Sequence, residues 1–537
     1  MPLLPRALRR FYRGSGLRTV WGSKKALFLL NLALIAFILL RKRHAKSGCG
    51  DEAPPNNYDP EVYFYAAVER AFDGFNFMHE MRTGKAKPKA PQMPDKIFYD
   101  NYRAQSHSCW FRKLQFRGSQ DEGGWQSLYS RDDSAPRQEV QLFGAYMDRR
   151  VGVARVLGMS RRSVQQSLYC HLHSSDSTVT TVTVSRAVEI WERAWDPRTR
   201  FYIPVVFDCP IPINMQHSVS LDSLSVSFEP CPNYAIDNRL RFGVEPGSIR
   251  EQRKRRNSVV VCVKGMDFLE DVSVRLLEWI EWQRLLGADK VVLYTYYVHP
   301  NASKVIAHYA KEGFVQQIRL SLPGEQPNLP YQRSRYIWRN RQQKRRNEIV
   351  PYNDCLYRHL HSHDFALIVD TDEIVIPLLH NNWTAMLDEL TATEPNRVPP
   401  WTAFSIRNVF KFDASTDTKD STVPEYLHTL RHRRRSSKVN PRGEYGKSFM
   451  FLPNLVSVFN HFPMGKLLPA NELKNTVHVK PSVALKLHYK RGCPVESRRE
   501  CRELTEDTVE DGSTDRFARR LERNVRRAMR ELGIKGI

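Results

Sequence analysis

Three carboxylates stand close together between two apolar runs in residues 366–377, ALIVDTDEIVIP. Asp370 and Asp372 are two positions apart, so at the end of a strand their side chains project toward the same side. Such a pair repels in a partly dry site unless a cation lies between the two groups. Oxygen ligands suit Mn²⁺ or Mg²⁺, which keep positions open for substrate phosphates. The spacing predicts a metal site on Asp370 and Asp372, and an acidic turn without metal is the alternative. Glu373 is expected to brace the turn, orient the site or reach an acceptor.

The segments around this block alternate between two hydrophobic patterns. Short apolar runs predict strands at 258–265, 290–297, 314–322 and 365–370. Apolar residues at helical spacing predict helices at 271–287, 303–313 and 345–363. Strands that are apolar on both faces and alternate with helices predict a Rossmann-type, mostly parallel sheet with helices on both faces. Ligands bind at the carboxyl ends of strands in such α/β sheets, and Asp370 lies at such an end.

The chain before this α/β region, which we assign to residues 257–500, has a different pattern. β-Branched residues alternate with polar ones at 177–185, 202–208 and 217–228. This pattern predicts an antiparallel sheet or sandwich, within a smaller β-rich accessory domain at 96–256.

The C-terminal segment, 501–537, contains an amphipathic helical pattern at 515–532. Its apolar face consists of Phe517, Leu521, Val525, Ala528 and Leu532. We expect this helix to pack on the α/β domain, and binding to a membrane or an anionic glycan is the alternative.

The N-terminus carries an apolar segment, 26–40, between basic residues. The greater positive charge before it predicts a signal anchor with residues 1–25 as a cytosolic tail. Residues 41–95 then form a stem, and the rest of the chain lies in a secretory lumen. A cleaved signal peptide is the alternative, but the long basic leader disfavours it.

Two further features suit a lumen. Asn301 and Asn382 begin N-glycosylation triplets, and all nine cysteines follow the anchor. An oxidising compartment would let many of them pair, but an odd number leaves at least one over. Cys49 is the candidate for a free or intermolecular thiol, which would permit a homodimer, and Cys493 and Cys501 are candidates for a local bridge. The spacing of the cysteines does not predict a structural zinc site.

The net charge of +24 suits acidic partners. Basic clusters at 333–346 and 431–438 resemble nucleic-acid patches, but a luminal location excludes nucleic acid as a partner. The clusters are then solvated loops, or they contact an acidic substrate or nucleotide phosphates.

Several motifs within residues 257–500 together resemble glycosyltransferase family 92. They are VVVCVKG (259–265), EWIEWQRLLGADKVVLY (278–294), NDCLYR (353–358), DTDE (370–373), FSIRNVF (404–410), GKSFMFLP (446–453) and LHYKRGC (487–493). FGAYMDRR (143–150) and FDCPIP (207–212) resemble the family's accessory region. The resemblance implies a GT-A-like fold and inverting transfer of galactose from UDP-galactose, with Mn²⁺ or Mg²⁺. The product would be a β-linkage on a glycan acceptor, carried by a glycoprotein or polysaccharide. It also implies a single-pass type II protein of the Golgi membrane.

The resemblance also suggests roles for single residues. His488 matches the family's late histidine and is expected to be a third metal ligand or a phosphate contact. Apart from the resemblance, Lys264 just past the first strand, with Lys447 or Lys490, is a candidate to pair with phosphate, and a solvated lysine is the alternative. Asp354 and Arg358 either face the nucleotide or form an ordinary helix ion pair.

An inverting transfer needs a general base for the acceptor hydroxyl. The candidates are Asp413, Glu425, Glu444 and Glu472, and the sequence does not choose among them. Thr295 and Tyr296 stand where a carboxylate or amide is common in the family, so the contacts to the donor are expected to differ here.

Three rival interpretations remain. A phosphotransferase of the haloacid dehalogenase type also places DxD after a strand, but it needs Thr or Val where this chain has Ile374. A non-catalytic glycan-binding or scaffold protein could share the fold. Within the enzyme class, the donor could be another UDP-sugar, such as UDP-glucose or UDP-N-acetylglucosamine. Turnover of nucleotide sugars distinguishes these interpretations.

Overall fold

The computed structural model describes residues 124–130, 138–176, 178–216, 221–231, 238–243, 256–392, 401–413, 420, 422–467, 476–492 and 498–534. The predicted tail, anchor and stem lie outside these residues, as do Cys49, Glu472 and Cys493. Among the described helices, none is both long and apolar enough to cross a bilayer.

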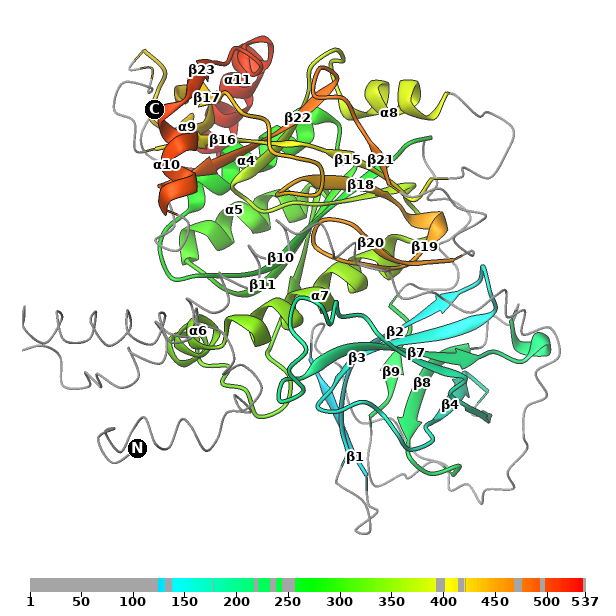
Figure 1. Cartoon of the computed structure of the whole chain (residues 1–537). Helices are drawn as coiled ribbons and strands as arrows, with labels where there is room; N and C mark the ends of the chain where they lie inside the picture. Colours follow the sequence, from blue (N-terminus) through cyan, green and yellow to red (C-terminus); the bar gives the residue numbers. More distant parts are fainter. Residues whose placement is uncertain are drawn as a thin grey trace, which may run out of the picture. The chain divides into compact units, whose positions relative to one another are not determined.

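The DTDE block follows the central strand of a seven-stranded sheet, five strands of which are labelled in Figure 1. In spatial order its strands are β12 (Val315–Arg319), β11 (Lys290–Val298), β10 (Val259–Phe268), β13 (Phe365–Ile368), β18 (Lys447–Phe451), β15 (Ala403–Ile406) and β21 (Val477–His478). The first four strands are parallel, whereas β18 is antiparallel to both β13 and β15. The predicted α/β class and all four predicted strands are confirmed, and the sheet is mixed.

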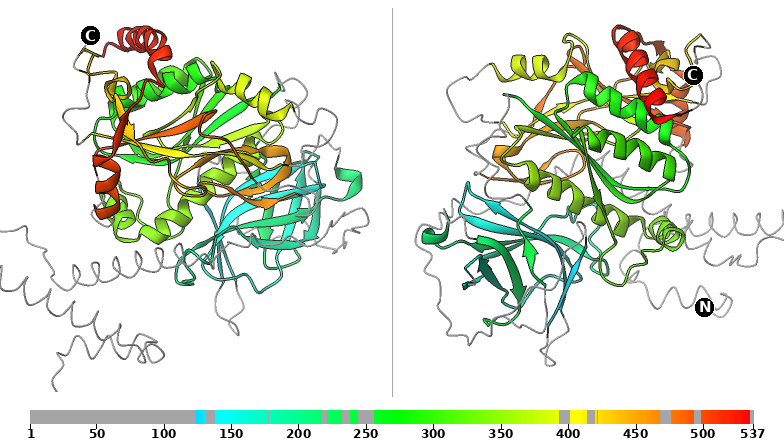
Figure 2. Two further views of the ribbon diagram at one scale, coloured as in Figure 1. Left: turned by 45° about the horizontal axis from the view of Figure 1, so that its top comes forward. Right: turned by 180° about the vertical axis from the view of Figure 1, so that it is seen from behind.

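Helices cover both faces of this sheet, which explains strands that are apolar on both sides (Figure 2). Val259 and Val261 share one core with α4 (Ser273–Leu286), α5 (Pro300–Lys311) and α11 (Asp515–Leu532). Val260 and Cys262 point the other way, into a core that contains α7 (Arg341–His359). The remaining helices are α6 (Pro330–Arg339), α8 (Trp383–Thr391), α9 (His428–Arg431) and α10 (Arg498–Glu506), with 3₁₀ turns at Ile213–Met215 and Leu452–Asn454.

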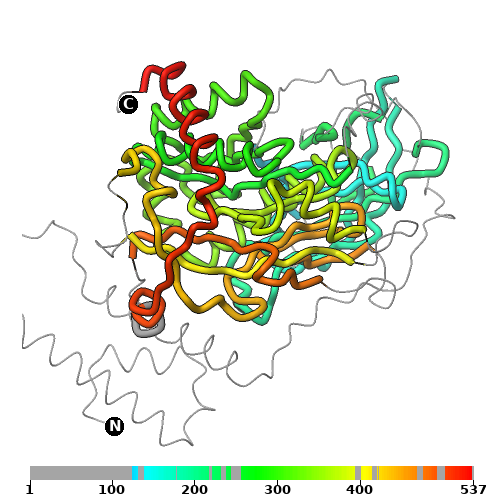
Figure 3. Tube along the Cα trace, turned by 90° about the horizontal axis from the view of Figure 1, so that it is seen from above, coloured from blue at the N-terminus to red at the C-terminus, as the bar shows by residue number. Residues whose placement is uncertain are grey.

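The C-terminal helix α11 has the bounds that its pattern predicts. It lies beside α4 (Figure 3), with the Phe517 and Trp282 ring centroids 5.6 Å apart. Packing on the α/β domain is thus confirmed. Leu532 is only partly buried, whereas the other four predicted apolar positions are fully buried.

A small three-stranded sheet lies over the end of β13. Its order is β14 (Glu373–Pro377), β22 (Ala484–Lys490) and β16 (Asn408–Phe412). The antiparallel register of β14 and β22 pairs Glu373 with His488. This register brings the LHYK motif to the DTDE motif, although they are far apart in the sequence. Two short ribbons complete the region: β17 (Arg434–Ser436) with β23 (Thr508–Glu510), and β19 (Leu455–Val458) with β20 (Pro463–Lys466).

The N-terminal described region is β-rich, as predicted. One antiparallel sheet contains β1 (Gln126–Tyr129), β2 (Glu139–Asp148), β3 (Val153–Ser160), β7 (Ile203–Pro210) and β6 (Arg186–Glu189). A second contains β5 (Val179–Thr183), β4 (Tyr169–Ser174), β8 (Leu221–Ser227) and β9 (Leu240–Arg241). Their inner faces share one apolar core, and the Cys170–Cys209 disulfide joins β4 to β7.

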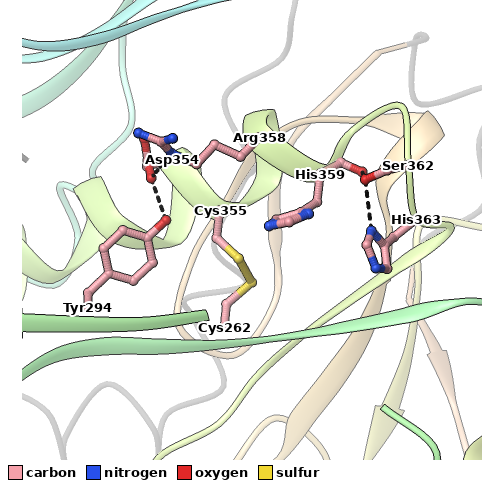
Figure 4. Close-up of a disulfide and its surroundings, with 8 residues drawn as sticks. All are labelled: Cys262, Tyr294, Asp354, Cys355, Arg358, His359, Ser362 and His363. Carbon is pink, nitrogen blue, oxygen red and sulfur yellow. Dashed lines mark hydrogen bonds and ion pairs between the residues drawn. A yellow bond between two sulfur atoms is a disulfide. The ribbon is translucent and has the colours of Figure 1, made fainter. Parts of the chain in front are cut away.

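The helix α7 connects the β-rich region to the α/β sheet. Its Asp354 is fully buried and accepts hydrogen bonds from Tyr146 of β2 and Tyr294 of β11. Arg358 forms the i,i+4 ion pair with Asp354 at 2.8 Å (Figure 4). Of the two predicted roles for this pair, the structure shows the helix ion pair, because Asp354 is enclosed between the two regions. A disulfide, Cys262–Cys355, also joins α7 to β10.

Cysteine pairing agrees with the expectation from the sequence. Cys231 is disulfide-bonded as well. The proposed Cys493–Cys501 bridge depends on a residue outside the described part of the chain.

We predict that Arg358→Met destabilises the protein by about 3–5 kcal/mol, because it leaves the Asp354 carboxylate buried without its cation. The matched control is Arg526→Met. Arg526 forms an i,i+4 pair with Glu522 at 2.7 Å, but both side chains are well exposed. That variant should lose much less unfolding free energy, because solvent screens an exposed ion pair. Denaturant-induced unfolding measures both, and equal losses would contradict the structural role given to Arg358.

Candidate active site

The DTDE block forms a tight turn between β13 and β14. The backbone N–H of Glu373 donates to the Asp370 carbonyl at 3.0 Å. The backbone N–H of Asp370 donates to the Glu373 carboxylate, also at 3.0 Å. Glu373 thus braces the turn, which is one of the three roles expected for it.

Glu373 is only 2% exposed, and two fully buried lysines neutralise its charge. Lys447 Nζ lies 3.4 Å from one carboxylate oxygen, and Lys486 pairs with the other. Burial alone would raise the pKa of Glu373, but these two ammonium groups hold that pKa well below its usual range. A carboxylate with so low a pKa is a weak proton acceptor. The environment therefore favours a positioning role for Glu373 over general-base catalysis.

Asp370 is paired with lysines on both sides. Lys264 Nζ, from β10, lies 3.1 Å from one carboxylate oxygen, and Lys447 Nζ, from β18, lies 4.0 Å from the other. Burial opposes ionisation, but these cations lower the pKa of Asp370. Lys264 also lies 3.7 Å from Glu348 of α7. Its side chain is 27% exposed, and its contact with a ligand phosphate stays a prediction.

Lys447 occupies a different position from Lys264. It is completely buried, and its ammonium donates to Asn460 at 2.6 Å as well as facing the two carboxylates. A direct phosphate contact would require access that the buried ammonium does not have here. In this arrangement Lys447 supports the carboxylate turn from behind.

Asp372 faces outward, with 44% of its side chain exposed. His488 Nε2 lies 3.4 Å from its carboxylate, and Lys490 Nζ lies 3.6 Å from it. The backbone of Tyr489 donates to the Asp372 carbonyl at 2.9 Å. The His488 ring stacks on Phe410, with ring centroids 5.4 Å apart. These contacts fix both side chains at the carboxyl end of the central strand.

The chemistry of this pair fits a divalent cation. His488 Nε2 is buried and has no hydrogen-bond partner among the described residues. Burial and then the Lys486 charge lower the pKa of His488, which favours the neutral imidazole that binds metals. Asp372 supplies an exposed carboxylate next to that nitrogen. Asp370 is instead paired with Lys264 and Lys447, and in the described part of the chain the ligand atoms of Asp370, Asp372 and His488 do not all lie within 4.8 Å of one another.

Lys486 was missed by the sequence analysis, although a signal exists. Lys486, His488 and Lys490 occupy alternate positions of β22, so they share one face of the strand. The period-two pattern ALKLHYK could have added Lys486 to the predicted set.

The predicted general bases lie in different surroundings. Glu425 is 93% exposed and lies 3.6 Å from Arg431. Glu444 is in a partly exposed turn after Pro441. Asp413 contacts His432 at 2.6 Å. Glu472 lies outside the described residues. The structure therefore does not choose a base.

Other predicted residues are placed as follows. Thr295 is buried and accepts a hydrogen bond from Gln317, so it is occupied within the sheet. Asn301 is exposed and donates to Asp271 at 2.6 Å. The side-chain oxygen of Asn382 caps α8. The side-chain amide nitrogen of Asn382 takes no part in that cap.

A buried acid, Glu278 of α4, lies behind the site. Its carboxylate accepts hydrogen bonds from the backbone and hydroxyl of Thr429, which holds the start of α9 in place. Burial raises the pKa of Glu278 to about 7.

Acidic residues at the carboxyl end of a central parallel strand, backed by lysines, are typical of α/β enzymes that bind phosphorylated ligands. Residues 257–528, slightly more than half of the chain, match the model of glycosyltransferase family 92. The chain belongs to glycosyltransferase family 92. This membership implies a sugar donor and a glycan acceptor. Among curated proteins, none gives a significant match.

We predict that Glu278 makes the protein less stable as pH rises. The folded protein keeps this proton up to about pH 7, whereas the unfolded chain releases it near the ordinary pKa of 4.5, so stability falls between these values. Glu278→Gln keeps an oxygen that accepts from Thr429 but does not titrate. Between pH 5 and pH 8 the wild type should lose about 2.5 kcal/mol more unfolding free energy than the variant. Parallel losses in denaturant titrations would contradict this assignment.

Proposed function

We propose that the protein is a metal-dependent inverting glycosyltransferase that moves galactose from UDP-galactose to a glycan acceptor and forms a β-linkage. The observation that supports it most strongly is the pairing of Asp372 with His488 at the end of the central strand, in a member of a glycosyltransferase family. An exposed carboxylate beside a buried imidazole Nε2 that has no hydrogen-bond partner among the described residues suits a cation that must also meet a substrate.

Asp372 and His488 would hold Mn²⁺ or Mg²⁺, with Asp370 beside them. The bound cation would neutralise charge on the departing UDP. Lys264 and Lys490 flank the carboxylates and are 27% and 36% exposed, so both suit contact with the diphosphate.

The residues behind this site keep it in one geometry. Glu373 holds the turn through the Asp370 backbone, while Lys447 and Lys486 hold Glu373. Groups fixed in this way need little reorganisation as charge develops on the leaving group, which favours transfer. A base for the acceptor hydroxyl is still required, and its identity is open among the candidates named above.

We place the enzyme in the Golgi membrane as a single-pass type II protein, with residues 26–40 as anchor and the catalytic region in the lumen. The Cys170–Cys209 and Cys262–Cys355 disulfides suit an oxidising compartment. The exposed position of Asn301 suits N-glycosylation there.

We expect the purified full-length protein to turn over UDP-galactose with Mn²⁺, and a chelator to abolish the reaction. Asp372→Asn should lower kcat/KM by roughly 100-fold or more, because the isosteric amide is a poor metal ligand. Its unfolding midpoint should stay near that of the wild type, because the side chain is largely exposed. The assay is UDP release in a screen of UDP-sugars and glycan acceptors.

Glu522→Gln, on the exposed face of α11, is the control and should keep full activity. Preference for another UDP-sugar would correct the donor assignment. Full activity in chelator would reject the metal mechanism, and failure to turn over every nucleotide sugar would favour a non-catalytic role.

A further inference from the structure

A second group of metal-binding side chains lies near the end of β16. It consists of Asp413, which directly follows β16, His428, which begins α9, and His432, which directly follows α9. One potential ligand atom from each of the three lies within 4.8 Å of the other two. The two histidines are four positions apart, a spacing that places both rings on one side of a helical turn. Their ring centroids are 4.6 Å apart.

The hydrogen bonds of His432 fix which ring nitrogen carries a proton. Its Nδ1 lies 2.8 Å from the His428 carbonyl oxygen, and a carbonyl only accepts, so Nδ1 must donate. Its Nε2 faces the Asp413 carboxylate at 2.6 Å. If the ring is neutral, Nε2 presents its lone pair to the Asp413 carboxylate. The two groups then repel each other unless a second proton or a cation lies between them. An Nδ1–H bonded to a backbone carbonyl is the usual support of a histidine that binds metal through Nε2.

The surroundings favour a cation over a simple ion pair. His428 supplies a second imidazole, whose Nε2 lies 3.8 Å from the same Asp413 oxygen. Asp413 and His428 are 17% and 18% exposed, so an ion can enter, whereas His432 is nearly fully buried. Thr429, held by Glu278, fixes the backbone between the two histidines.

Two other charged groups lie near the cluster. Arg275 of α4 lies 3.9 Å from the second Asp413 oxygen, on the side away from the contact with His432. Lys411 donates to the His432 carbonyl, and Asp511 at 2.8 Å neutralises its charge.

This cluster is distinct from the Asp372–His488 pair. Along β22, His488 and Lys490 project toward Asp372, whereas Tyr489 projects to the opposite face. The Tyr489 ring lies 5.5 Å from His432 and 6.1 Å from His428, measured between ring centroids. The strand β22 therefore separates the two groups, and Tyr489 touches both: its ring packs on the histidines and its backbone donates to Asp372.

We propose that Asp413, His428 and His432 are the protein ligands of a second divalent-cation site, of the zinc type. One carboxylate and two imidazoles suit Zn²⁺ better than Mn²⁺ or Mg²⁺, and three protein ligands leave one position for water or another ligand. The bound ion joins the end of β16 to α9, behind the strand that carries His488. It thereby stabilises the packing that supports the sugar-nucleotide site.

The test is Zn²⁺ binding to metal-free full-length protein by calorimetry, together with the visible spectrum after addition of Co²⁺. The wild type should bind Zn²⁺ and give the absorption bands of four-coordinate Co²⁺. His428→Gln should weaken Zn²⁺ binding by about tenfold or more and remove these bands. Glu522→Gln, on the exposed face of α11, should leave both signals unchanged, because Glu522 belongs to neither group of metal-binding side chains.

The matched control is His308→Gln. His308 belongs to the other set of three clustered ligands in the described part of the chain, with Glu312 and Glu531, and already contacts both acids at 3.3 and 3.4 Å. Zn²⁺ binding that depends on His308 and not on His428 would overturn the proposal. Absence of Zn²⁺ binding and of Co²⁺ bands in the folded wild type would overturn it as well, without reliance on any variant.

Discussion

Two inner carboxylates, the partly buried Asp370 and the fully buried Glu373, are tolerated at the end of β13 because three lysines compensate for their charge. Leaving the Glu373 carboxylate buried without partners would cost several kcal/mol. Lys264, Lys447 and Lys486 come from β10, β18 and β22, so each cation arrives on a different strand. The site therefore exists only when all three strands are in place around β13. The chemistry of the site therefore depends on the correct arrangement of these strands.

With the inner carboxylates compensated, Asp372 is left to face outward beside His488. The site thus has an inner layer that is held by ion pairs and an outer pair that is accessible to a ligand. Support extends further from the site through α7. Its Glu348 contacts Lys264, while its Asp354 is held by tyrosines from β2 and β11. The β-rich region therefore stabilises the helix that positions one lysine of the site.

Local patterns in the sequence predicted much of this arrangement. Apolar runs identified β10 to β13, and helical spacing identified α11 with its observed bounds, because burial on one or two faces leaves a periodic signal. Asp370 was placed at a strand end for the same reason. The pairing of Asp354 with Arg358 was one of two predicted outcomes, because residues four apart on a helix always lie close together.

Contacts between distant segments were not predictable in this way. Lys447 was expected to meet phosphate, but β18 pairs with β13 and buries its ammonium behind the turn. Lys486 was overlooked because its partner Glu373 is 113 positions away in the sequence. Asp413 was considered only as a base, since nothing local reveals that α9 brings His432 to it. Periodicity reports which face of an element is buried, but it does not report which element covers that face.

In the proposed mechanism, Asp372 and His488 together hold the cation that meets the nucleotide diphosphate. The most direct measurement is a crystal structure with Mn²⁺ and UDP, with data collected to locate manganese by its anomalous scattering. We expect an anomalous peak in contact with the Asp372 carboxylate, His488 Nε2 and the UDP phosphates. A bound UDP with its metal away from both side chains, or with no metal between it and the protein, would rule out this metal site.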